Sequence, residues 1–209
     1  PEIIVLDEPT SYLDIRYKLE LLDILKRMAK EKGITVLMSL HEIDLAQKCA
    51  DRIVCVRGEE IMAYGTPEEV FYEETIEKLY DLDNGSYNPL SGSLELKKTE
   101  GEPEVFVISS GGNGTPIYRK LQREGRPFAA GILYTNDVDY QAARVLASKI
   151  ITEEPFEEIS DNTYKNAENM IDQCQIVVNA GVHIGSCNHR MRNLLQYAQE
   201  KGKLKRDYL

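Results

Sequence analysis

The 209-residue sequence predicts an α/β fold in two parts, each built on parallel strands joined by helices. Short apolar, β-branched runs alternate with amphipathic segments of helical length along most of the chain. A charged stretch at residues 97–104, which has no large apolar side chain, interrupts this pattern. We therefore expect a domain at residues 1–96, a linker at 97–104 and a second domain at 105–209.

The first part opens with a buried strand at residues 3–6, followed by an amphipathic helix at 15–32. Its expected buried face carries Ile15, Leu19, Leu22, Leu25 and Met28, and Gly33 is a stop signal. An apolar run at 34–40 predicts a second, fully buried strand parallel to the first, completing a βαβ crossover. The later expected elements are a helix at 42–50, strands at 52–57 and 60–64, a helix opening at 65–69 and a small hairpin within 82–96.

The second part repeats the alternation of strands and helices. Strands that alternate with helices of this length predict a small doubly wound parallel sheet, a Rossmann-like domain. The expected strands are 105–108, 128–133, 149–151 and 175–179, and the expected helices end near 124, span 138–147 and 162–174, and run from 186 towards 202.

Composition limits the classes of partner. A formal net charge of -10 opposes attraction to phosphate backbones, so we expect no nucleic-acid partner. No run approaches the roughly 18 apolar residues of a membrane span. The four cysteines form no CxxC pair and no signal peptide is visible, so they are interpreted as reduced cytoplasmic thiols.

Two carboxylates and a histidine are the candidate catalytic groups of the first part. Asp7 and Glu8 end the first strand, and His41 follows the second. The carboxyl ends of parallel strands meet at one edge of a sheet, so these side chains are expected to converge there. Two carboxylates after a buried strand resemble the Walker B arrangement of nucleotide-hydrolysing ATPases, which implies that Asp7 would hold Mg²⁺, Glu8 would polarise the attacking water, and His41 would reach the γ-phosphate of a nucleotide. The alternatives are two solvated acids and a structural histidine.

These motifs, in their order and spacing, resemble the Walker B, D-loop and switch-histidine segments of ABC-transporter ATPases. Over residues 1 to about 96 the chain resembles the subfamily that imports metal chelates such as iron siderophores, haem or cobalamin, although Tyr12 and Glu42 depart from its usual pattern. The strings that carry this narrower resemblance are Leu13-Asp14-Ile15-Arg16-Tyr17, His41-Glu42-Ile43-Asp44-Leu45-Ala46, Ala50-Asp51-Arg52-Ile53 and Gly65-Thr66-Pro67-Glu68-Glu69-Val70.

The resemblance implies ATP and Mg²⁺ as cofactors, and a second ATPase subunit and a transmembrane permease as partners. It also implies that Ser11 and Asp14 reach the opposite site of a head-to-tail dimer, and that the protein lies on the inner face of the membrane. The phosphate-gripping glycine loop with its lysine and the LSGGQ-type signature are absent from this sequence. We therefore expect these residues alone to be inactive as an ATPase.

A second glycine loop follows the strand at 105–108. It lacks both the lysine of a Walker A loop and the third glycine of a full dinucleotide fingerprint. Its exposed amides could receive a phosphate or carboxylate, or the loop could be a structural turn with Thr115 as helix cap. The candidate cofactor-binding residues of this loop are Gly111, Gly112, Asn113, Gly114 and Thr115.

Two further groups in the second part have ordinary structural interpretations. Asp137 and Asp139 lie where a helix begins, so capping is their expected role. His183, Cys187 and His189 could supply metal donors, but their spacing fits no standard site. The alternative function is a nucleotide- or small-molecule-binding regulatory module formed by this second domain.

Overall fold

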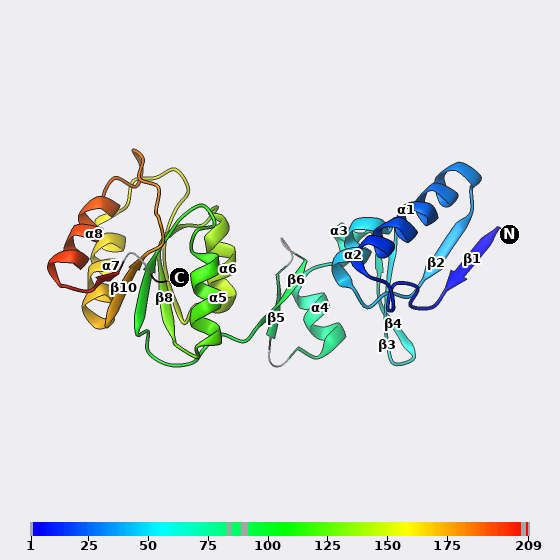
Figure 1. Ribbon diagram of the computed structural model, residues 1–209, viewed down its shortest axis with the longest axis horizontal. Coiled ribbons are helices and arrows are strands. Elements are labelled where there is room, and N and C mark those ends of the chain that lie inside the picture. Colours follow the sequence, from blue (N-terminus) through cyan, green and yellow to red (C-terminus); the bar gives the residue numbers. More distant parts are fainter. Residues whose placement is uncertain (1, 83–84, 89–91, 206–207, 209) are drawn as a thin grey trace. The chain divides into compact units, whose positions relative to one another are not determined.

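The computed structural model describes residues 2–82, 85–88, 92–205 and 208 (Figure 1). They belong to two compact units. Unit 1 comprises Pro1–Asp83 and Tyr87–Leu94, and unit 2 comprises Asn84–Ser86 and Glu95–Leu209. In the described ranges, no helix is both long and apolar enough to cross a membrane.

Unit 1 begins with a βαβ crossover. Strand β1 (Ile3–Leu6) leads to helix α1 (Ile15–Lys32) and strand β2 (Thr35–Met38), and the two strands pair in parallel. Asp14 caps α1 by accepting a hydrogen bond from the Tyr17 amide, and Gly33, at φ +63°, ends it. The crossover predicted from the sequence is confirmed.

Strands β1 and β2 are covered on one face only, which corrects the expectation that both are fully buried. Ile3 and Val5 are 60% and 70% exposed and Leu37 is 57% exposed, whereas alternate residues are partly buried. Successive side chains of a strand point to opposite faces, and among the described residues only one face is covered. The apolar stripe of α1 is likewise buried only at Leu22 and Leu25, because Ile15 and Leu19 are exposed.

The remaining elements of unit 1 surround a small apolar core of Phe71, Ile76 and Tyr87. Two antiparallel strands turn at Gly58 (φ +60°), and the hairpin predicted within 82–96 is present as a two-stranded sheet. The elements are α2 (Ile43–Cys49), β3 (Ile53–Arg57), β4 (Glu60–Gly65), α3 (Pro67–Val70) and α4 (Glu73–Tyr80), together with β5 (Gly85–Asn88) and β6 (Ser93–Leu96), whose residues are divided between the two units.

Unit 2 contains a five-stranded sheet in the order β11-β10-β7-β8-β9, with every adjacent pair parallel. Numbered within the unit, this is strand order 3-2-1-4-5, the Rossmann arrangement, with its switch point between β7 and β10. The strands are β7 (Val105–Ile108), β8 (Phe128–Tyr134), β9 (Lys149–Glu153), β10 (Ile176–Asn179) and β11 (Leu204–Lys205).

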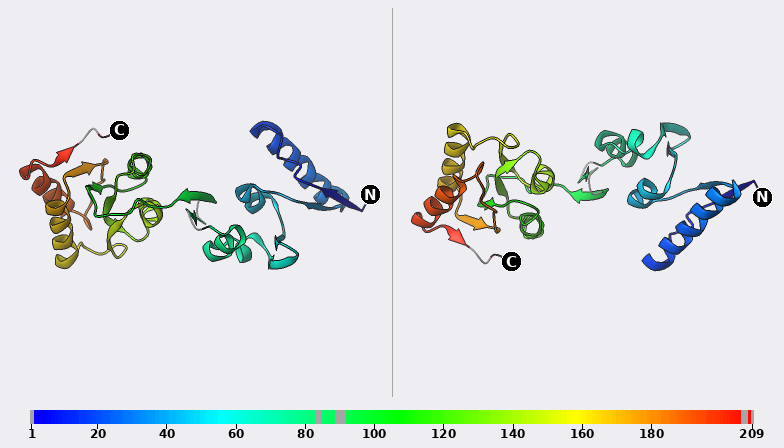
Figure 2. Two further views of the ribbon diagram at one scale, coloured as in Figure 1. Left: turned by 90° about the horizontal axis from the view of Figure 1, so that it is seen from below. Right: turned by 90° about the horizontal axis from the view of Figure 1, so that it is seen from above.

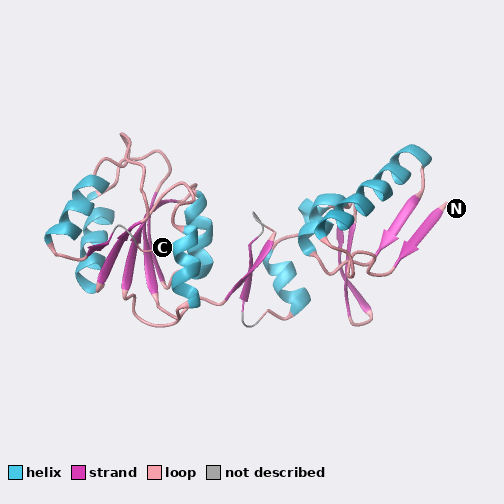
Figure 3. Cartoon of the chain, in the orientation of Figure 1, coloured by secondary structure: helices cyan, strands magenta, loops and turns pink. Residues whose placement is uncertain are grey.

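Helices cover both faces of this sheet (Figures 1 and 3). On one face α5 (Thr115–Arg123) and α6 (Val138–Leu146) bury Tyr118, Leu121 and Leu146. On the other, α7 (Asp161–Gln173) and α8 (Met191–Glu200) bury Ile171 and Leu194. The helix pairs are also seen on opposite sides in Figure 2. The predicted doubly wound α/β architecture is therefore confirmed.

Two details of unit 2 differ from the sequence-based expectation. Strand β11 was not expected, because two residues give too short a pattern to recognise. The stretch at 97–104, expected to be a linker, is packed on unit 2: Thr99 donates to the Arg126 carbonyl, and Glu104 donates to the Pro127 carbonyl. The carbonyl of buried Pro103 also accepts a hydrogen bond from the thiol of Cys174.

Candidate functional site

The carboxyl ends of β1 and β2 bring the predicted acidic residues against a serine. Leu6 lies opposite Met38 in the parallel register, so Asp7, Glu8 and Ser39 follow side by side. The Ser39 hydroxyl accepts from the Glu8 amide at 2.8 Å and donates to Asp7 Oδ1 at 2.6 Å. Ser39 therefore fixes the orientation of one carboxylate and the backbone of the other.

His41 completes this group. Its Nε2 lies 2.7 Å from Glu8 Oε1 although the residues are 33 positions apart. The Ser11 hydroxyl donates to the other Glu8 oxygen at 3.0 Å. Glu8 has a φ of +42°, a backbone region that non-glycine residues rarely adopt and that often occurs at functional sites. Asp7, Glu8 and His41 thus share one edge of the sheet.

The two D-loop residues have contacts within the chain. Ser11 contacts Glu8, and Asp14 caps α1 through the Tyr17 amide at 3.2 Å. Capping is the ordinary role of an aspartate before a helix. The expected contact of Ser11 and Asp14 with the ATP site of a second subunit involves another chain, so it stays a prediction.

Behind this edge, Glu42 joins three segments. It accepts from Lys18 Nζ at 2.6 Å and from the Thr10 hydroxyl at 2.9 Å, and Thr10 is buried. The Lys18 ammonium, followed by the Thr10 hydroxyl, holds the pKa of the Glu42 carboxyl below its usual 4.5. This network ties α1 and the turn after Glu8 to the segment that carries His41.

Sequence reasoning did not assign roles to Ser39, Thr10 or Lys18. The position of Ser39 beside Asp7 follows from the register that places Leu6 opposite Met38, which the structure shows and the apolar runs alone do not specify. The contacts of Thr10 and Lys18 with Glu42 span 32 and 24 positions, and no local sequence pattern indicated them.

Asp7 is the candidate Mg²⁺ ligand. In the described part of the chain, no three His, Cys, Asp or Glu side chains are grouped to hold a metal ion. This includes His183, Cys187 and His189. A single carboxylate still suits Mg²⁺, which in nucleotide sites takes one or two carboxylates and completes its shell with phosphate oxygens and water. The donor chemistry at Asp7 thus fits a magnesium nucleotide better than an ion held by protein alone.

The glycine loop of unit 2 has different chemistry from that expected for an anion site. The Gly111 amide donates to both Asp137 oxygens at 3.0 Å. The Gly114 amide donates to both oxygens of buried Asp139, at 3.1 and 2.9 Å, and the amide and hydroxyl of Thr115 donate to its Oδ1 at 3.0 Å. The amides of Gly111, Gly114 and Thr115 already bind two carboxylates, so the structure favours the structural-turn interpretation.

The same loop contacts the loop after β10 across the switch point. Asn113 Nδ2 donates to the Gly181 carbonyl at 3.0 Å, and the His183 amide donates to the Ser110 hydroxyl at 3.0 Å. Gly114 is the N-cap residue and Thr115 is the first helical residue of α5, which corrects the expectation that Thr115 is the cap. The predicted capping role of Asp137 is confirmed, since it accepts from the Asp139 amide.

Comparison with known proteins finds sequences similar to this chain. A sequence model of the MJ0874 family matches residues 128–205, which lie within unit 2. An uncharacterised ABC transporter ATP-binding protein, MJ0873 from Methanocaldococcus jannaschii, is 37% identical over 134 residues, covering 64% of this chain and 46% of that protein.

Two further relatives have named transport roles. The cobalamin import ATP-binding protein BtuD of Halobacterium salinarum is 25% identical, covering 79% of this chain and 43% of its own length. The ferric enterobactin transport ATP-binding protein FepC of Escherichia coli is 39% identical, covering 38% of this chain and 30% of its own length. These homologues confirm the resemblance to ABC-transporter ATP-binding proteins of the metal-chelate type. The chain spans less than half the length of each of these curated relatives.

One solved structure, an inward-facing ABC transporter of the metal-chelate type, aligns with a TM-score of 0.37 and 24% identity. The alignment covers 38% of this chain and 32% of that chain. We draw no conclusion from so low a score.

Proposed function

We propose that this chain forms part of an ATP-hydrolysing subunit that energises import of a metal chelate. Its homologues are ATP-binding proteins of ABC transporters, including cobalamin and ferric enterobactin transport proteins. The observation that carries the proposal is the contact between Glu8 and His41 beside Asp7. Two acids and an imidazole at one sheet edge match the needs of phosphoryl transfer to water.

Each residue has a distinct proposed role. Bound Mg²⁺ would neutralise charge that develops on the phosphate oxygens. Asp7, oriented by Ser39, would hold the ion directly or through water. Glu8 would accept a proton from the attacking water as general base, and His41 would hydrogen-bond to Glu8 and to the γ-phosphate. Ser11 would help to fix the Glu8 carboxylate.

The proposal also concerns what these 209 residues can do in isolation. The sequence contains no glycine loop followed by lysine that could grip the β- and γ-phosphates. We therefore expect the 209 residues by themselves to release no phosphate from ATP. The amino acids encoded immediately before Pro1 test this, because the proposal requires such a loop and an LSGGQ-type segment there.

The proposed partners are a second ATPase subunit, which Ser11 and Asp14 would approach, and a transmembrane permease. The proposed location is the cytoplasmic face of the membrane, held there by the permease. The proposed cargo is a siderophore, haem or cobalamin, because similar ATP-binding proteins are named for cobalamin import, for ferric enterobactin transport and, in Rhodopseudomonas palustris, for hemin import.

The direct test is steady-state ATP hydrolysis by the whole protein that contains these residues. Glu8→Gln should lower kcat by about 100-fold or more while ATP still binds, because it removes the general base and keeps the shape. Glu20→Gln, an exposed position on α1, is the matched control and should leave kcat unchanged. Equal activity in the Glu8 and Glu20 variants would refute the assignment of Glu8.

The second candidate function is small-molecule binding by unit 2. The Rossmann strand order favours it, because ligands of such folds bind at the switch point, where the loops after β7 and β10 meet. A ligand there would meet Asp137 and the Asn113 side chain, so we expect nucleotides to be poor ligands. Thermal denaturation of the chain with adenine nucleotides, cobamides and siderophore-like anions tests this, since a ligand of the folded state raises the midpoint.

A further inference from the structure

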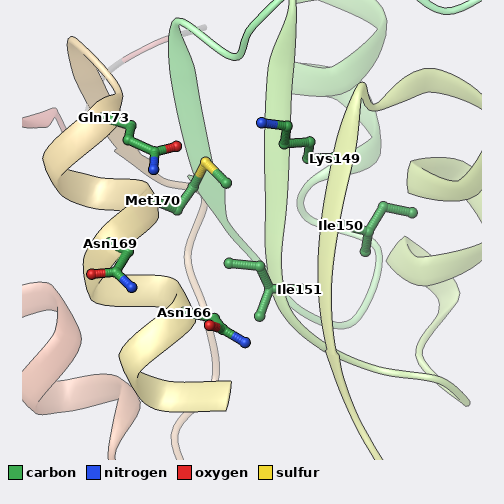
Figure 4. Close-up of a pocket in the computed structure, with 7 residues that line it drawn as sticks. All are labelled: Lys149, Ile150, Ile151, Asn166, Asn169, Met170 and Gln173. Carbon is green, nitrogen blue, oxygen red and sulfur yellow. The ribbon is translucent and has the colours of Figure 1, made fainter. Parts of the chain in front are cut away.

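Strand β9 is one edge of the unit 2 sheet, and the two-residue strand β11 is the other; Lys149 of β9 is exposed and the rest of the strand is partly exposed. Strand β9 pairs with β8 on one side, and on its other side no strand pairs with it in the described chain. An open edge offers backbone donors and acceptors to another strand. Beside it lies a pocket of about 450 Å³ between β9 and α7 (Figure 4). The edge is therefore both unpaired and accessible.

The pocket has the chemistry of a polypeptide contact. Asn166, Asn169 and Gln173 are spaced three and four residues apart, so they lie on one face of α7. Their carboxamides can both donate and accept hydrogen bonds, as backbone amides do. Ile151 and Met170 supply apolar surface between them. These features suit a strand and its side chains better than a charged small molecule.

The sequence of β9 indicates which strand fits. From residue 149 to 153 it reads Lys-Ile-Ile-Thr-Glu, with a cation at one end and an anion at the other. If the β9 strands of two copies pair antiparallel with Ile151 facing Ile151, Lys149 of each copy lies opposite Glu153 of the other copy. The dimer then contains two such charge pairs. Opposite charges in such cross-strand pairs are stabilising, and like charges are destabilising.

We propose that β9 is a self-association edge, where unit 2 pairs with unit 2 of a second copy of this chain and forms one continuous sheet. The contact would be isologous, with Ile151 on the two-fold axis. This inference is independent of the ATPase proposal, because every residue that carries it lies in unit 2.

The two charged side chains of β9 already have contacts within the chain, which the pairing would share or replace. Glu153 accepts hydrogen bonds from the amides of Ser160 at 2.7 Å and Glu154 at 3.2 Å, which fix its carboxylate. Lys149 contacts Glu102 at 2.6 Å, but Glu102 is highly exposed, so this ion pair is weak and leaves the ammonium available. An extended peptide from another protein would lack the symmetric charge match, which is why we assign the edge to a second copy.

Sedimentation velocity of the 209-residue chain over a concentration series tests the proposal. A monomer–dimer equilibrium is expected. Lys149→Glu should raise its dissociation constant about tenfold or more, because both cross-strand charge pairs become repulsive. Arg192→Glu makes the same charge change at an exposed position on α8 and should leave the constant unchanged. A monomer at every concentration, or a dimer indifferent to Lys149→Glu, overturns the proposal.

Cysteine cross-linking tests the register separately. Residues facing each other across an antiparallel pair have Cα atoms about 4.5–5.5 Å apart, within reach of a disulfide. Ile151→Cys should therefore give a disulfide-linked dimer under mild oxidation. Ile150→Cys is the matched control: residue 150 would face residue 152 of the other copy, so two such cysteines would lie about 7–8 Å apart and link poorly. Equal cross-linking of both variants, or of the unsubstituted chain, contradicts the proposed register.

Discussion

Both carboxylate oxygens of Asp139 accept a hydrogen bond from the Gly114 amide, at 3.1 and 2.9 Å, and no surface of Asp139 is exposed. The second residue of α6 thereby binds the start of α5. A carboxylate is favourable there because the first amides of a helix carry partial positive charge. The helix end that could have received a ligand phosphate is neutralised by the protein's own side chain.

Replacing Asp139 tests this relationship. Asp139→Ala should lower the free energy of unfolding by about 3 kcal/mol, because the buried Gly114 amide and two partly buried donors on Thr115 lose their acceptor. Urea denaturation of the chain measures the change. Asp137→Ala, at a partly exposed carboxylate that also binds the loop, should cost clearly less. Equal losses would show that burial of Asp139 is not the source of its effect.

Gly114 is required because of close contacts rather than an unusual backbone angle. Its φ of -77° suits any residue, but an added Cβ would lie 2.4 Å from Ser109 Oγ and 2.6 Å from Tyr118 Cζ. Gly114→Ala should therefore lower stability by about 1–3 kcal/mol through overpacking, measured by the same denaturation. Gly185→Ala is the control, since its added Cβ meets nothing closer than 3.9 Å. Similar stability of the two variants would contradict the predicted clash.

The ionised Glu42 carboxylate should stabilise unit 1, so the stability of unit 1 should fall at acidic pH. The carboxyl of Glu42 has a lower pKa when folded than when unfolded, because it binds Lys18 and Thr10. The stabilisation is therefore fully present above about pH 4.5 and is lost as the pH falls through the lower, folded-state pKa. Glu42→Gln cannot titrate and should lack this loss.

Hydrogen exchange of peptides covering α1 and α2, followed from about pH 6 downwards, measures this effect. The protection of the unsubstituted chain should decline more steeply with acid than that of Glu42→Gln. Glu20→Gln, which changes an exposed carboxylate on the same helix as Lys18, should follow the unsubstituted chain. Parallel pH profiles for the Glu42 variant and the unsubstituted chain would contradict the prediction.

The four thiols should differ in reactivity. Cys174 and Cys55 are buried, and burial raises the pKa of Cys174 to about 11, so little reactive thiolate forms near neutral pH. Cys187 and Cys49 are both partly exposed, but burial raises the pKa of the Cys49 thiol, so Cys187 should react first with a thiol reagent. In a time course of labelling by the reagent, Cys174→Ser should remove one slowly reacting thiol, whereas Cys187→Ser should remove one rapidly reacting thiol. A single rate for all four thiols would contradict the described burial.

Local sequence patterns predicted most elements because each depends on neighbouring residues. Helix α1 was expected at 15–32 and occupies those residues, since Asp14 and Gly33 are local signals for its ends. The exposure of Ile3 and Leu37 was not predicted, because an apolar run does not specify whether an element covers both faces of its strand.

By itself, then, the sequence determined the α/β class, the position of most helices and strands, and the convergence of Asp7, Glu8 and His41, because parallel strands deliver their carboxyl ends to one edge. Only the tertiary structure decided which donors and acceptors are already satisfied. It pairs Asp139 with the amides of Gly114 and Thr115, and among the residues that it describes no strand pairs with the outer side of β9. Such contacts depend on how distant segments pack, and short-range periodicity carries no information about that packing.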